Sequence, residues 1–151
     1  MEWLLLAVVV FNGILAGLSV DKVVVQLPAR RRMGVVAYAH YARAADLGNG
    51  TALYSVTGVG AALLTIVTGV AASANDASTT VRFLLISAAA LSVLHSAATA
   101  VAAPAMFRVG ESPDTEADLA PLLSRFTYAS AVRTVLQVAT FALVAFAATV
   151  G

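Results

Sequence analysis

The sequence predicts an all-α integral membrane protein, a bundle of four transmembrane helices formed by a single domain over residues 1–151. Hydrophobic residues make up 60% of the chain and charged residues only 11%, whereas a soluble domain carries about 25% charge. Four apolar stretches are each long enough to cross a bilayer, which takes about 20 residues. The charges lie between these stretches, which cover residues 3–20 (extendable to 27), 51–72, 83–103 and 126–150.

The first apolar stretch is expected to stay in the membrane as a helix. Glu2 is the only charged side chain before it, and it has neither a basic leader nor a clear cleavage site. Gly13 and Gly17 form a small-residue face that lets two helices approach closely, within the chain or between copies in a homo-oligomer. Asn12 is expected to hydrogen-bond a neighbouring helix, and Pro28 is expected to end this helix.

The basic residues predict the orientation of the chain. The first connection holds five of them and the third holds two, whereas the second, around residues 73–81, has none. Positively charged loops stay in the cytoplasm, so connections one and three are expected inside and both termini outside, in the inner membrane of a bacterial cell with membrane lipids as neighbours. The basic residues of connection one are Lys22, Arg30, Arg31, Arg32 and Arg43; those of connection three are Arg108 and Arg125.

An amphipathic segment over residues 33–47 separates the triple arginine from the second apolar stretch. Its polar residues His40, Arg43 and Asp46 recur every three positions, which places them on one stripe of a helix. The segment either lies along the inner membrane surface or continues the second transmembrane helix into the cytoplasm. This stripe is expected to face solvent or headgroups, or to contribute to a site.

Arg133 is the most informative residue of the last apolar stretch. Seven uncharged residues precede it there and seventeen follow it, and a guanidinium at that depth costs several kcal/mol unless it has a partner. Ser130, Gln137 and Thr140 share its helix face through spacings of three and four. This polar face is therefore expected to point into the bundle.

His95 is expected in the same layer as Arg133. It is the only ionisable residue inside the third apolar stretch, and Pro104 near its inner end is expected to kink or end that helix. At roughly 1.5 Å per residue, His95 and Arg133 both lie about 10 to 12 Å from the inner ends of their helices. Asp21 is the first candidate to neutralise Arg133, and Asp46 is its rival.

Metal, cofactor and nucleic-acid chemistry find no support in the sequence. The chain has no cysteine, which excludes disulfides and thiolate metal sites. Its two histidines are not spaced along the chain as metal ligands are, so neither a metal nor a haem is expected. With a net charge of +1, no nucleic-acid partner is expected either.

Short segments along nearly the whole chain resemble a known family. They are AGLSVDKVVVQLPA at 16–29, HYARAADLGNG at 40–50, AAPAMFRV at 102–109 and AVRTVLQVATFALVAFA at 131–147. In order and spacing they resemble the anthrone-oxygenase-like family of small membrane proteins. The resemblance implies a four-helix membrane bundle and, for the few members with an assigned role, cofactor-independent oxygenation of a polycyclic anthrone to a quinone. It carries over no catalytic residues.

Two functions remain open from the sequence. The first is a membrane enzyme or binder for a lipophilic aromatic or quinone-like molecule that enters from the inner leaflet. Arg133 would then hold an ionised oxygen and His95 or His40 would act as general base, with contacts from Gln137, Ser130, Asp21, Arg43 and Asp46. The second is a non-catalytic helical subunit or scaffold in which Arg133 forms a salt bridge with Asp21 or Asp46.

Overall fold

Four long helices build the protein, as the computed structural model of residues 2–75 and 77–151 shows. Each is long and apolar enough to cross a membrane, and they cover Glu2–Met33, Val35–Ala74, Thr79–Glu111 and Glu116–Val150. No strand occurs in the described residues, so the predicted all-α class is confirmed. In detail the elements are α1 (Glu2–Asp21), a π-helical turn (Lys22–Gln26), α2 (Leu27–Met33), α3 (Val35–Ala44), a second π-helical turn (Ala45–Asn49), α4 (Gly50–Ala74), α5 (Thr79–Glu111) and α6 (Glu116–Val150).

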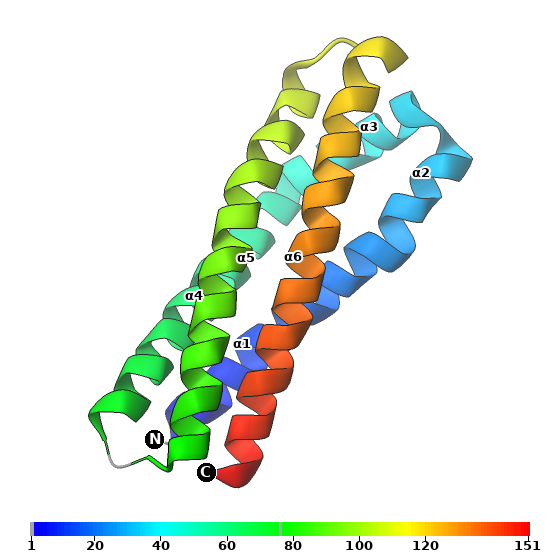
Figure 1. The fold of residues 1–151 in the computed structure, drawn as a ribbon. Helices are drawn as coiled ribbons and strands as arrows, with labels where there is room; N and C mark the ends of the chain where they lie inside the picture. The colour runs from blue at the N-terminus through cyan, green and yellow to red at the C-terminus, as the bar shows by residue number, and fades with distance from the viewer. Residues whose placement is uncertain (1, 76) are drawn as a thin grey trace.

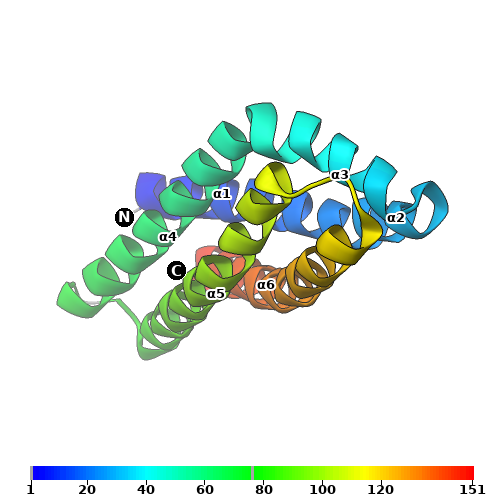
Figure 2. The same ribbon diagram turned by 90° about the horizontal axis from the view of Figure 1, so that it is seen from above.

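The long helices run up and down and close into a ring. The two termini and the connection between α4 and α5 lie at one end of the bundle, and the α2–α3 and α5–α6 connections lie at the other (Figure 1). α5 and α6 share the largest interface, α4 packs on α5, and α1 packs on both α4 and α6. Seen from above, α1, α4, α5 and α6 surround a common centre, with α2 and α3 as an arm at one side (Figure 2).

Local sequence fixes where the helices begin. Ser78 caps α5 by accepting a hydrogen bond from the Val81 backbone N–H. Thr115 caps α6 in the same way from Asp118, and Glu116 and Asp118 add negative charge to that first turn. Capping hydroxyls and acidic first turns both stabilise a helix N-terminus.

Pro28 does not end the first helix, contrary to the prediction. The chain turns through the π-helical segment Lys22–Gln26 and enters α2 with Pro28 in its first turn, the part of a helix where proline is best tolerated. Gly34 ends the helix instead, with a φ of +87° that suits only glycine without strain.

The amphipathic segment 33–47 continues the second long helix. α3 leads through the second π-helical turn into α4, and the backbone breaks from helical geometry at Gly48 (φ −83°, ψ −123°). Pro104 does not end α5, which runs on to Glu111.

Two apolar clusters hold the bundle at its ends. The cluster near the termini joins α1, α4, α5 and α6 through residues such as Val8, Leu85 and Val144. The cluster near the loops joins α2, α3, α5 and α6 through Tyr38, Leu119 and others. The outer surface is also apolar, and its most exposed large side chains include Trp3, Val56, Phe83 and Val135. An apolar outer surface with polar groups inside suits a lipid environment.

Gly60 shows how tightly α1 approaches α4. A Cβ at this position would lie 2.6 Å from the Phe11 ring, closer than carbon atoms can approach. On α1 itself, the Cβ position of Gly13 is 3.2 Å from the Phe141 ring of α6. The Gly13 face of α1 is therefore used for packing within the chain.

Candidate functional site

A cavity of about 410 Å³ lies between α1, α4, α5 and α6. Its wall is mostly apolar, with Leu15, Leu63, Met106, Phe107 and Phe126 among the lining residues. The polar residues that line the same cavity include Lys22, Asp46, Tyr54, His95, Ser130 and Arg133. The helices bring these six together from five different segments of the chain.

Arg133 has no partner for its guanidinium among the described residues. Its Nε is buried and makes no hydrogen bond. The predicted salt bridges to Asp21 and Asp46 are wrong. Asp21 is exposed and accepts a hydrogen bond from Gln26, and Asp46 pairs with another cation.

His95 packs against Arg133 through the backbone. Its Nδ1 lies 3.1 Å from the Arg133 carbonyl oxygen. A carbonyl oxygen only accepts, so Nδ1 carries the hydrogen, and the neutral ring keeps an unprotonated Nε2. The predicted proximity of the two residues is confirmed, although the contact involves the Arg133 backbone and not its side chain. His95 thus combines a fixed orientation with a nitrogen that can take up a proton.

Lys22 and Asp46 form a buried ion pair beside the cavity. Lys22 Nζ lies 2.5 Å from Asp46 Oδ1, and the two side chains are only 8% and 6% exposed. Lys22 also donates to Gln26 and lies 5.5 Å from the centroid of the Tyr54 ring. Each member of the pair sits in one of the two π-helical turns, a distortion that is common at functional sites.

The sequence did not reveal this pair. From the sequence, Lys22 is expected only to help orient the chain in the membrane, and Asp46 is expected on the helix stripe of His40 and Arg43. In the structure Asp46 lies in the π-helical turn and does not share the contacts of that stripe. The sequence held one indication of the pair. Lys22 follows the first apolar stretch and Asp46 precedes the second, on the same predicted side of the membrane.

Two further polar atoms beside the cavity have no hydrogen-bond partner in the described residues. They are the second carboxylate oxygen of Asp46, Oδ2, and the Ser130 hydroxyl. Both residues are more than nine-tenths buried. We use the name Arg133 layer for Arg133, His95, Ser130, Lys22 and Asp46, a layer in which several hydrogen-bonding groups remain free.

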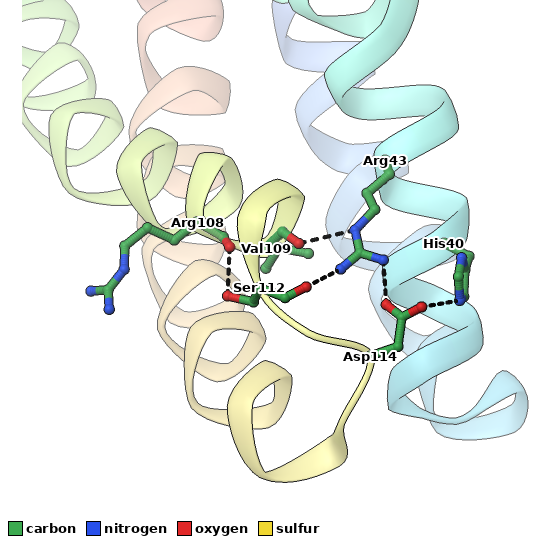
Figure 3. Close-up of polar contacts among 6 residues, drawn as sticks. All are labelled: His40, Arg43, Arg108, Val109, Ser112 and Asp114. Atoms are coloured by element: carbon green, nitrogen blue, oxygen red, sulfur yellow. Dashed lines mark hydrogen bonds and ion pairs between the residues drawn. The ribbon is translucent and has the colours of Figure 1, made fainter.

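His40 and Arg43 lie away from this layer, so the predicted participation of His40 beside Arg133 is not seen. Figure 3 shows both side chains meeting Asp114 of the α5–α6 connection. Arg43 also donates to the backbone oxygens of Val109 and Ser112, at 3.0 and 2.7 Å. The hydrogen bond from Arg43 holds the pKa of Asp114 below its usual value. This exposed cluster ties α3 to the end of α5.

Gln137 does not line the cavity but joins a second polar layer one turn away. Its amide nitrogen donates to the backbone oxygen and to Oδ1 of Asn12, at 3.3 and 2.9 Å. Asn12 Nδ2 donates in turn to Thr65 Oγ1 at 2.9 Å and to the Val8 carbonyl. This Asn12 layer (Asn12, Thr65 and Gln137) links α1, α4 and α6, which confirms the expected hydrogen bond from Asn12 to a neighbouring helix.

The structure describes no group of three or more His, Asp or Glu side chains that could hold a metal ion in residues 2–75 and 77–151. Comparisons with protein-family models, curated proteins and solved structures found no match. Fold and site together define the class: a bundle of four helices long and apolar enough to span a membrane, with a mostly apolar cavity between them and an arginine without a partner among the described residues.

Proposed function

We propose that the cavity binds a lipophilic aromatic or quinone-like molecule and that Arg133 holds an ionised oxygen of that molecule. The unpartnered Arg133 guanidinium carries this proposal. Arg133 is partly exposed, and its Nε is buried. A cation without a counter-ion in an apolar bundle is costly, and an anionic ligand oxygen would offset that cost. The volume of about 410 Å³ is in the usual range for small-molecule sites, and apolar walls with a few polar groups are their usual lining.

The proposal extends to catalysis through His95. Its Nε2 is free to remove a proton from an acidic C–H of the ligand, and Arg133 would stabilise the resulting enolate or phenolate. The chemistry implied by the anthrone-oxygenase resemblance fits these two groups. The anion would react with dioxygen, one oxygen atom would become the new quinone carbonyl, and the other would leave as water with the two hydrogens of the methylene carbon.

Binding is tested with Arg133→Gln in purified, detergent-solubilised protein. The probe is a naphthoquinone with one acidic hydroxyl, which is ionised at neutral pH. Loss of a charge-assisted hydrogen bond worth about 1.5 to 3 kcal/mol should weaken binding roughly 10- to 150-fold. Arg125→Gln is the matched control, because Arg125 is exposed on the same helix. Equal affinity of the Arg133 variant and the wild type would contradict the proposal.

Turnover is tested with His95→Asn and a hydroxyanthrone, followed as oxygen consumption. Asparagine keeps a donor near the position of Nδ1 but has no base at the position of Nε2. The rate should fall by about 10² or more, with binding of the naphthoquinone retained. Undiminished oxygen consumption would remove His95 from the mechanism and leave the binding proposal standing.

We also propose that the protein is a multi-pass protein of the bacterial inner membrane with both termini outside. The basic residues around the α2–α3 and α5–α6 connections support this orientation. The chain has no cysteine, so single cysteines at Ser112 and Ser78 can be labelled individually in intact cells. A membrane-impermeant maleimide should modify the Ser78→Cys variant and spare the Ser112→Cys variant; the reverse pattern would invert the orientation.

A further inference from the structure

Asp46 lines the cavity, and one of its two carboxylate oxygens is not used by the Lys22 ion pair. Oδ1 of Asp46 faces Lys22 at 2.5 Å, but Oδ2 is buried without a partner in the described residues. A buried carboxylate oxygen that accepts no hydrogen bond is strongly unfavourable. Something that donates a hydrogen bond should therefore meet Oδ2 when the cavity is filled.

The donors that contact Asp46 do not serve Oδ2. Lys22 Nζ serves Oδ1 and Gln26. Thr51, another residue of the cavity wall, donates its hydroxyl to the Asp46 backbone oxygen at 3.0 Å. The Tyr38 hydroxyl is likewise buried without a partner in the described residues. Oδ2 therefore makes no hydrogen bond within that part of the chain and is available to a donor from outside it.

We propose that Asp46 determines ligand specificity: its Oδ2 accepts a hydrogen bond from a hydroxyl group that the ligand carries in addition to the ionised oxygen held at Arg133. This inference rests on the proposed function. Asp46 reaches the cavity from the turn before α4 and Arg133 from α6, so the two contacts come from different helices. The ligand class becomes a lipophilic aromatic with one acidic oxygen and at least one further hydroxyl.

The test begins with wild-type protein and three probes that share one acidic hydroxyl. They are the naphthoquinone used above, its analogues with an additional hydroxyl on the other ring, and the matching methyl ethers. Wild type should bind at least one hydroxyl isomer about tenfold or more tightly than its ether and the parent compound. Equal affinities across the series would overturn the inference, because a water molecule would then serve Oδ2 as well as the ligand does.

Asp46→Asn identifies the residue responsible. The new amide keeps an oxygen for Lys22 and can place its NH₂ group where Oδ2 was, so it donates where the carboxylate accepted. The preference for the hydroxyl over the methyl ether should disappear or reverse. Glu111→Gln is the matched control, since it makes the same carboxylate-to-amide change at an exposed residue at the end of α5 and should leave the preference intact. A preference that survives Asp46→Asn in folded protein would overturn the assignment.

Failure of this inference is distinguishable from failure of the proposed function. If the wild type binds every probe with equal affinity and Arg133→Gln weakens the binding of all of them, the cavity is a binding site but Asp46 does not determine its specificity. If no probe binds to the wild type, the proposed function fails and the inference fails with it. The wild-type series decides the question even if Asp46→Asn does not fold.

Discussion

Gln137 and Arg133 are four residues apart on α6, about 6 Å along the helix axis, yet their side chains meet opposite surroundings. In the Asn12 layer, both amide hydrogens of Gln137 and both of Asn12 have acceptors. In the Arg133 layer, the guanidinium Nε, the Ser130 hydroxyl and Asp46 Oδ2 have no hydrogen-bond partner among the described residues.

The difference separates a structural use of polar residues from a binding use. A helix bundle in lipid stabilises itself with polar side chains when they satisfy one another across helices. Polar side chains that stay unsatisfied beside a cavity are unfavourable in the empty protein and become favourable when a complementary molecule enters. The Asn12 layer therefore holds helices together, and the Arg133 layer is suited to bind a ligand.

The largest expected effect on stability comes from the Lys22–Asp46 ion pair of the Arg133 layer. Lys22→Met should destabilise the protein by about 3 to 5 kcal/mol, because it leaves the Asp46 carboxylate buried without its cation. Lys22→Met combined with Asp46→Leu should recover most of that loss. The free energy of unfolding in mixed detergent micelles measures both, and strictly additive effects of the two substitutions would show that the pair is not coupled.

The next effect compares the two layers directly. Gln137→Leu should lower the free energy of unfolding by about 1 to 2 kcal/mol, since the acceptor oxygens of Asn12 lose the hydrogen bonds that Gln137 donates. Arg133→Gln should leave stability unchanged or raise it, because it removes a cation that has no partner. The same unfolding assay without ligand compares them. A large loss for Arg133→Gln would mean that Arg133 is structural and would erase the distinction between the layers.

The smallest effect belongs to the exposed cluster around Asp114. The pKa of Asp114 is lowered in the folded state by the Arg43 hydrogen bond. The ionised carboxylate therefore stabilises the fold above the ordinary carboxyl pKa of about 3.9, and this contribution is lost as the pH falls through the lower folded value. Asp114→Asn should lower the thermal midpoint slightly at pH 7, less at high salt, and progressively less as the pH falls below the ordinary carboxyl pKa of about 3.9. A constant difference at every pH would point to packing and not to charge.

Sequence reasoning succeeded where hydrophobicity and helical periodicity decide the outcome. The four apolar stretches, the inward face of Ser130, Gln137 and Thr140, and the shared layer of His95 and Arg133 follow from counting residues along helices. All of them depend on regular α-helical geometry.

The errors arose where that geometry changes. The π-helical turn at residues 45–49 holds Asp46, which does not share the contacts of His40 and Arg43, and the turn at 22–26 places Pro28 in the first turn of α2. Regular spacing could not anticipate either. Asp46 pairs with Lys22 and not with Arg133 because of how the helices pack in three dimensions. Counting residues from the membrane surface cannot predict this packing.

The two π-helical turns also make the chain sensitive to length in a particular way. Each turn accommodates about one residue more than an α-helical turn would, and one residue corresponds to about 100° of rotation around a helix axis. A single deletion between Lys22 and Gln26 would be absorbed by reverting to an α-turn. The helix would stay continuous and α2 would keep nearly its present orientation, whereas a deletion from the regular α-helix on either side would rotate everything beyond it by about 100°. The two π-helical turns are therefore the places where these long helices tolerate the loss of one residue.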